Sequence, residues 1–137
     1  MEHEIQNTGG FGDCSRLVIG ACIEVHRFLG PGLLESAYEQ CLAHELSLLG
    51  LHFERQRPLP VTYKGIVLES GYRLDFVLEE KLVVEVKAVE RLLPVHEAQV
   101  LTYLKLTSVP VGLLVNFHSE TIRSGLRRLT LRASQSP

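Results

Sequence analysis

The stretch of sequence that decides the fold is YRLDFVLEEKLVVEVKA, residues 72–88. Apolar residues alternate with other residues on both sides of a polar centre, and a period of two indicates β-strands. The apolar positions are Leu74, Phe76 and Leu78 on the first arm, and Leu82, Val84 and Val86 on the second. The polar residues 79–81 between the arms are typical of a turn, so the stretch predicts a β-hairpin.

Two acidic residues of this hairpin are predicted to face each other. If residues 79–81 form the loop, counting outward along both arms places Asp75 opposite Glu85. The same count places Arg73 opposite Lys87, and the period of two puts Lys87 on the same face as Glu85. Directly opposed residues have Cβ atoms about 4.5–5.5 Å apart, where like charges are destabilising. Two carboxylates at this spacing in a hydrophobic hairpin therefore require an explanation.

Two explanations fit the facing acids. Mg²⁺ takes oxygen ligands and is usually held by one or two carboxylates together with substrate phosphate, so the pair predicts a metal site. The neighbouring lysine would then hold a phosphate or a water. Alternatively, the charges lie in water on a half-exposed antiparallel strand pair, which is a common arrangement. A loop of even length would put Asp75 and Glu85 on opposite faces and remove the metal argument.

The composition is that of an ordinary soluble domain and excludes a polycation. The 137 residues suit one domain, and the formal net charge is −2. Any contact with nucleic acid must therefore come from a local patch. Cys14, Cys22 and Cys41 have no C-x-x-C spacing, which argues against a disulfide framework or a zinc site and favours a reducing compartment. Without a signal-peptide region or a membrane-spanning run, we expect a cytoplasmic protein with no membrane partner.

The remaining periodicity predicts a single domain over residues 13–132, with disordered ends at 1–12 and 133–137. Helical spacing of apolar residues predicts helices over residues 13–29, 33–49 and 94–106. The strands predicted outside the central hairpin cover residues 51–57, 59–63, 66–69, 109–117 and 126–131. Residues 109–117 form a nearly continuous apolar run, so we expect that strand to be buried on both faces and to pair parallel to an earlier strand.

Polar residues on two predicted helices gather near the hairpin. Glu35 lies in the first turn of the second helix, where an acid alone is stabilised by the helix dipole by about 0.3–1 kcal/mol. His96, Gln99 and Tyr103 stand at i, i+3 and i+7 and form a polar stripe on the third helix. Because this helix directly follows the strand of Glu85, a short crossover would bring its first turns over the end of that strand.

Four arginines fall within ten residues near the C-terminus: Arg123, Arg127, Arg128 and Arg132. Such a cluster is able to track the phosphates of a nucleic acid. It is equally typical of a solvated edge strand. Arg55, in the predicted strand 51–57, is interpreted as a solvated charge.

Several motifs together resemble those of a known family. GLLESAY, residues 32–38, has the Gly-x-x-Glu-x-x-Tyr pattern for which the GxxExxY family is named. Further pieces with the same likeness are EVHRFLGPG (24–32), GYRLD (71–75), VEVKAV (84–89), PVHEAQ (94–99), YLK (103–105) and GLLVNF (112–117). The resemblance spans residues 17–129, and the combination is specific, whereas the Glu-x-Lys piece alone is weak.

The GxxExxY family is grouped with the PD-(D/E)XK nuclease-like superfamily, which includes restriction endonucleases and Holliday-junction resolvases. The resemblance implies a restriction-endonuclease-like α/β fold, with an α-β-β-β-α-β core and a central mixed β-sheet flanked by helices. The predicted elements follow the same order. Leu74 stands where the motif name has proline, but many members vary there, so no inference is drawn from it.

The resemblance also assigns roles to residues. Those implied to be catalytic are Asp75, Glu85, Lys87, Gln99 and Glu35. The implied ligands of Mg²⁺ or Mn²⁺ are Asp75, Glu85, Glu35 and the carbonyl of Val86. Lys87 would position the attacking water or stabilise negative charge on phosphate. Gln99 would orient Lys87 or contact the nucleic-acid backbone.

These roles predict a divalent-metal-dependent nuclease that hydrolyses phosphodiester bonds. The implied partner is nucleic acid, with DNA favoured over RNA, and a homodimer is the oligomeric state to consider because many related enzymes act as dimers. The residues expected to contact nucleic acid are His96, Tyr103, Arg73, Arg123, Arg127 and Arg128. Two other readings stay open: a nucleic-acid- or protein-binding module without turnover, against which the intact acids count, and a structural protein whose acids are exposed.

Overall fold

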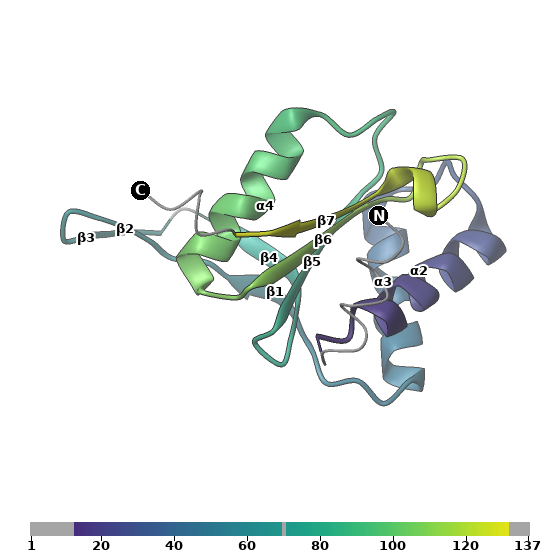
Figure 1. Ribbon diagram of the computed structural model, residues 1–137, viewed down its shortest axis with the longest axis horizontal. Helices are drawn as coiled ribbons and strands as arrows, with labels where there is room; N and C mark the ends of the chain where they lie inside the picture. Colours follow the sequence, from purple (N-terminus) through teal and green to yellow (C-terminus); the bar gives the residue numbers. More distant parts are fainter. Residues whose placement is uncertain (1–12, 70, 132–137) are drawn as a thin grey trace.

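Figure 1 shows the computed structural model, which describes residues 13–69 and 71–131. Its elements, in chain order, are α2 (Ser15–Leu29), α3 (Glu35–Leu48), β1 (Glu54–Pro58), β2 (Val61–Tyr63), β3 (Ile66–Leu68), β4 (Arg73–Leu78), β5 (Leu82–Lys87), α4 (Pro94–Thr107), β6 (Val111–Asn116), the 3₁₀ helix η1 (Arg123–Gly125) and β7 (Leu126–Thr130). The predicted α-β-β-β-α-β order is confirmed, with an added hairpin and a last strand.

Five strands form one mixed sheet in the order β1-β4-β5-β6-β7. β5 and β6 are parallel, joined through α4, and the other neighbouring pairs are antiparallel. In the central hairpin Leu78 pairs with Leu82, and the N–H of Lys81 donates to the carbonyl of Leu78 at 2.9 Å. Glu79 and Glu80 take positive φ angles of 53° and 55° to close the turn. The odd loop length, on which the facing acids depend, is therefore confirmed.

Helices cover both faces of the sheet, with α2 and α3 on one face and α4 on the other (Figure 1). Side chains alternate along β5, so Val84 and Val86 pack with the α2 and α3 residues, whereas Val83 packs with those of α4. Each fully buried apolar side chain of this kind stabilises the fold by about 1.5–3 kcal/mol. Glu85 lies within the same doubly covered strand, so the fold carries an ionisable group into its core.

β2 and β3 form a separate two-stranded sheet that projects from the main sheet (Figure 1). Its turn residues, Lys64 and Gly65, have φ angles of 48° and 86°, as hairpin turns with positive φ at both central positions require. The predicted hairpin around these residues is confirmed, and most of its side chains are exposed.

The predicted elements agree with the structure to within a few residues at their ends. The strand predicted over 51–57 is observed as β1, and the apolar run over 109–117 contains β6. Within residues 13–69 and 71–131, none of the helices has both the length and the apolar character needed to cross a membrane. The predicted domain limits stay predictions, because residues 1–12 and 132–137 lie outside the described residues.

Candidate functional site

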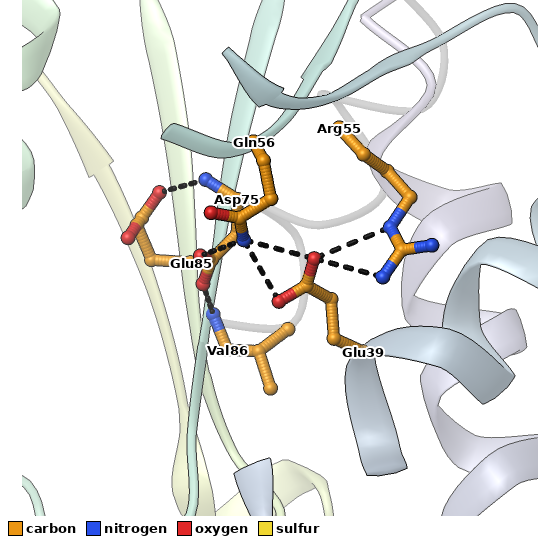
Figure 2. Close-up of polar contacts among 6 residues, drawn as sticks. All are labelled: Glu39, Arg55, Gln56, Asp75, Glu85 and Val86. Carbon is orange, nitrogen blue, oxygen red and sulfur yellow. Dashed lines mark hydrogen bonds and ion pairs between the residues drawn. The ribbon is translucent and has the colours of Figure 1, made fainter. Parts of the chain in front are cut away.

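The pairing of β4 with β5 ends at Phe76 and Val84. Beyond these residues, two carboxylate side chains accept hydrogen bonds from the main chains of the two strands. The N–H of Asp75 donates to Glu85 Oε2 at 2.8 Å, and the N–H of Val86 donates to Asp75 Oδ2 at 2.8 Å. Each acid therefore bonds the main chain of the opposite strand (Figure 2). This exchange joins the strands where the ladder has ended. The placement of Asp75 directly opposite Glu85 stays a prediction, because the paired register stops at Phe76 and Val84.

Burial makes both of these acids hard to ionise. Glu85 is only 4% exposed, because β5 is the central strand and is covered on both faces. Burial, and then the charge of Asp75, raises the pKa of Glu85 to about 8. Asp75 is half-buried, and burial raises its pKa to about 6, although the hydrogen bond from Val86 opposes the rise. For both acids, therefore, the effect of burial on the pKa outweighs the opposing effects of nearby hydrogen bonds and positive charge.

Two further predicted residues lie near enough to change these pKa values. Glu35, exposed in the first turn of α3, raises the pKa of both acids. Lys87, half-buried at the end of β5, lowers the pKa of both. Neither side chain makes a hydrogen bond or an ion pair within the part of the chain that the structure describes. The side chains of Glu35 and Lys87 thus lie close to Asp75 and Glu85 and have no hydrogen-bond partner among the described residues.

A buried carboxylate that no motif marked out extends the site. Glu39 on α3 is 8% exposed and accepts from Arg55 Nε at 3.2 Å and Nη2 at 3.1 Å. Gln56 Nε2 lies 3.0 and 2.9 Å from the two oxygens of Glu39 and 3.2 Å from Asp75 Oδ1. Glu39 stands four positions after Glu35, and this spacing was the available signal, because i and i+4 share a helix face. Arg55, interpreted as a solvated charge, is indeed exposed, and in addition it pairs with this buried acid.

Helix α4 brings Tyr103 close to Glu85. Tyr103 is 6% exposed, and burial, followed by the charge of Glu85, raises its pKa to about 12. Gln99, one turn earlier, is half-buried and makes no hydrogen bond within the described residues. His96 Nδ1 accepts from the N–H of Leu93 at 2.9 Å, a bond that caps the helix. Of the predicted stripe, Tyr103 thus lies beside the acids and His96 has a structural partner.

Of the four C-terminal arginines, Arg132 lies outside the described residues, and Arg127 and Arg128 do not converge on one surface. Arg127 Nε pairs with Glu97 Oε2 of α4 at 3.4 Å, whereas Arg128 Nη2 pairs with Asp13 Oδ2, just before α2, at 3.4 Å. Because α4 and α2 cover opposite faces of the sheet, these consecutive arginines point to opposite sides of β7. Arg123 is exposed in η1. A continuous phosphate-tracking patch that includes both Arg127 and Arg128 is therefore not formed.

Arg73, by contrast, reaches the site. It lies at the start of β4, two residues before Asp75, and its side chain is largely exposed. Its Nη1 donates to the carbonyl oxygen of Gln56 at 3.1 Å. Arg73 is therefore the predicted nucleic-acid contact that lies nearest to the acids along the strand.

The chemistry of the donors fits a hard divalent cation. Asp75, Glu85, Glu35 and the carbonyl of Val86 all offer oxygen, which Mg²⁺ and Mn²⁺ prefer. The raised pKa values of the two strand acids fit the same conclusion. Burial takes away the water that would stabilise the ionised carboxylates, and a bound cation would stabilise them instead. Among residues 13–69 and 71–131, however, no group of three or more histidine, cysteine or acidic side chains is arranged to hold a metal ion. Binding would therefore require side chains to turn, or a substrate to supply further ligands.

The fold and the two strand acids followed by a lysine define a restriction-endonuclease-like α/β domain. Residues 12–129 match the family described as the PD-(D/E)XK nuclease superfamily, and the chain belongs to that superfamily. The superfamily inferred from the sequence motifs is confirmed, whereas the narrower likeness to GxxExxY proteins stays a resemblance. No curated protein and no solved structure matches the chain.

Proposed function

We propose that this protein is a divalent-metal-dependent nuclease that hydrolyses phosphodiester bonds. The observation that supports it most is the cross-bonded pair of half-buried Asp75 and buried Glu85 at the end of the β4–β5 ladder, near Lys87, whose side chain has no hydrogen-bond or ion-pair partner among the described residues. A structural pair would gain from a bond to Lys87, because an unpaired charge is costly near a dry site. A site that must receive an ion and a phosphate has a reason to leave these groups available.

Each residue of the candidate site has a role in this proposal. Asp75 and Glu85, with Glu35 and the carbonyl of Val86, would hold Mg²⁺ or Mn²⁺. When bound, the ion would supply polarisation of the scissile phosphate and a lowered pKa for a water molecule. Lys87 donates to that water or to the phosphate oxygens as negative charge develops. Gln99, without a partner among the described residues, orients Lys87 or contacts the nucleic-acid backbone.

The proposed substrate is nucleic acid, with DNA as the first form to test. Arg73 supports a nucleic-acid substrate, because it is exposed and lies on β4 two residues before Asp75, a predicted metal ligand. Its side chain contacts the main chain of Gln56 on the paired strand β1. His96 and Arg123 are secondary candidates for phosphate contact. Tyr103 is better suited to pack against the acids, since its side chain is buried. Whether two copies act together as a homodimer remains part of the proposal.

A second candidate function is a nucleic-acid- or protein-binding module without turnover. One observation favours it: Asp75 and Glu85 each already accept a main-chain N–H, which satisfies part of their charge without a metal. In that case the exchange would be a permanent structural feature. The two functions differ in whether an ion displaces these bonds.

The test combines calorimetric titration of Mg²⁺ and Mn²⁺ with cleavage assays on single- and double-stranded DNA and RNA. We expect wild type to bind the ion and cleave at least one form, whereas Asp75→Asn and Lys87→Met lose about 100-fold or more of the rate. Lys81→Met, in the exposed hairpin loop, is the matched control and should cleave like wild type. Full activity in the Asp75 and Lys87 variants would refute the assignment, and metal binding without any cleavage would favour the binding module.

A further inference from the structure

A row of hydrogen-bonded side chains leads from Asp75 to the ion pair between Glu39 of α3 and Arg55 of β1. Gln56 Nε2 donates to Asp75 Oδ1 at 3.2 Å and lies 3.0 and 2.9 Å from the two oxygens of Glu39. Arg55 holds Glu39 from the far side through Nε and Nη2. Figure 2 shows the order of these side chains, with Gln56 between the two carboxylates. The amide is thus the link between a candidate metal ligand and a buried, neutralised acid.

The backbone at Gln56 is bent so that this link forms. Its φ angle is 52°, in the left-handed region that non-glycine residues seldom adopt. The β1–β4 ladder pairs Arg55 with Phe76 and Arg57 with Leu74, and it skips position 56. Consecutive side chains of a regular strand point to opposite faces, yet Arg55 and Gln56 both reach Glu39. The bend accounts for this convergence.

Other contacts hold the bent peptide in place. Arg73 Nη1 donates to the carbonyl oxygen of Gln56 at 3.1 Å, so a side chain of β4 holds this peptide. Backbone strain of this kind persists only where the surroundings fix it, and it gathers at functional sites. Glu39 itself is unsuited to be a metal ligand, because Arg55 already offsets its charge. The hydrogen-bonded row therefore bears on the orientation of the Asp75 carboxylate, which Gln56 contacts directly.

We propose that Gln56 is a positioning residue for Asp75, and that Glu39 and Arg55 fix Gln56 in its orientation. The inference rests on the proposed function, because it concerns how Asp75 is presented to a divalent cation. Asp75 Oδ2 is held by the N–H of Val86 and Oδ1 by Gln56, so both oxygens have a fixed direction. Outer groups that orient a ligating carboxylate typically change metal affinity or activity by about 10–100-fold.

The test uses two substitutions at Gln56 that separate the amide from the backbone bend. Gln56→Met keeps the length of the side chain and removes the amide. Gln56→Gly also removes the amide but suits a φ angle of 52°, so it guards against a loss caused only by misfolding. Gln40→Met, on the exposed surface of α3, is the matched control. Glu39→Gln removes the charge that Arg55 offsets while it keeps an acceptor for Gln56.

The readouts are Mg²⁺ affinity by calorimetry, cleavage rate, and the carboxyl signal of Asp75 in the metal-free protein. The sequence contains two aspartates, Asp13 and Asp75, so selective ¹³C labelling of aspartate carboxyls gives two signals, one of them an internal reference. We expect both Gln56 variants to shift the Asp75 signal and leave that of Asp13 in place. Their Mg²⁺ dissociation constant should rise about tenfold, and Gln56→Gly should melt no lower than wild type.

The proposal would be overturned by an Asp75 signal at its wild-type position in both Gln56 variants, or by wild-type Mg²⁺ affinity in both. A loss confined to Gln56→Met with a lowered melting temperature would also overturn it, because the amide would then matter only for folding. If wild type neither binds Mg²⁺ nor cleaves nucleic acid, the proposed function fails. The carboxyl signal then decides separately whether Gln56 orients Asp75.

Discussion

Glu85 is the residue at which burial and chemistry conflict most strongly. Its neighbours on β5, Val84 and Val86, are apolar and fully buried, as expected for a strand covered on both faces. A lone carboxylate at the same depth is costly to ionise, and burial raises its pKa to about 8. Groups with strongly shifted pKa values gather at functional sites. The conflict therefore supports a role for Glu85 beyond stability.

We expect the metal-free protein to lose stability as the pH rises. An acid whose pKa is raised on folding stabilises the fold at low pH, and this contribution is lost as the pH passes through the folded value, about 8 for Glu85. Asp75, with a pKa raised to about 6, acts in the same direction over a lower range. Urea unfolding in EDTA should therefore give a free energy of unfolding about 1–3 kcal/mol lower at pH 9 than at pH 5.5.

The control for this pH dependence is Glu85→Gln, which keeps an oxygen acceptor for the N–H of Asp75 but cannot ionise. We expect it to be more stable than wild type at pH 9 and to vary less between the two pH values. Glu79→Gln, in the exposed hairpin loop, should keep the wild-type dependence. If Glu85→Gln and wild type fall in parallel with pH, the carboxyl of Glu85 is not the source of the effect.

The sequence predicted the central residues of the site but not the groups behind them. Asp75 and Glu85 followed from counting outward from an odd loop, because strand register obeys a period of two. Gln56 had no such signal, since its side chain reaches Glu39 only through a left-handed bend. That bend depends on contacts from α3 and β4, which lie 17 and 19 positions away. Such tertiary effects override local periodicity.

At the scale of elements, helix α4 packs closely against strand β6 at Gly112. A Cβ placed on Gly112 would lie 2.6 Å from Val100 Cγ1 and 3.5 Å from Leu104 Cδ2. These branched side chains are packed against the sheet and fully buried, so they have little space to retreat. The absence of a side chain at Gly112 therefore allows α4 to lie close enough to bring Tyr103 to Glu85.

We expect Gly112→Ala to lower the free energy of unfolding by about 1–3 kcal/mol, as overpacking of a core does. Urea unfolding at fixed pH measures the change. Adding Val100→Ala should recover part of the loss, because it removes the atom that a new Cβ would meet. Gly20→Ala is the matched control, since nothing lies within 4 Å of a Cβ at this exposed position of α2. A loss as large at Gly20 as at Gly112 would contradict the packing argument.

Element positions were predicted more reliably than the directions of their charged side chains. The central hairpin, the projecting hairpin and the buried parallel strand were all confirmed. Arg127 and Arg128 were grouped by their closeness in sequence, although consecutive residues of a strand point to opposite faces. The alternation of side chains along β7 explains why Arg127 pairs with Glu97 and Arg128 with Asp13.

At the scale of the whole molecule, all three layers contribute residues to the candidate site. The sheet supplies Asp75, Glu85 and Lys87, the α2–α3 layer supplies Glu35, and α4 supplies Tyr103. The family motifs predicted this superfamily and its order of elements, because the motif residues are spread over all three layers. Whether the acids bind an ion is not encoded in that order. It depends on the orientation of a few carboxylates, which the sequence pattern does not fix.

The charge of the molecule leads to a prediction about nucleic-acid binding. The formal net charge is −2, and the acids of the site repel phosphate unless a cation is present. We therefore expect weak binding of labelled DNA in EDTA and about tenfold or tighter binding with Ca²⁺, measured by fluorescence anisotropy. The fitted salt dependence should be shallow, because each phosphate contact contributes a slope of about 0.9 and Arg127 and Arg128 point to opposite sides of β7.

Glu85→Gln separates this electrostatic effect from general loss of the fold. At pH 9, where the carboxyl of Glu85 is ionised, this variant removes one negative charge, so it should bind DNA in EDTA at least as well as wild type, yet gain little from Ca²⁺. Glu79→Gln removes the same charge from the distant hairpin loop and should retain the full gain. Equal gains in wild type and Glu85→Gln would mean that the cation acts elsewhere on the complex. In that case the carboxylates at the end of the β4–β5 ladder would not be the point at which the protein receives phosphate.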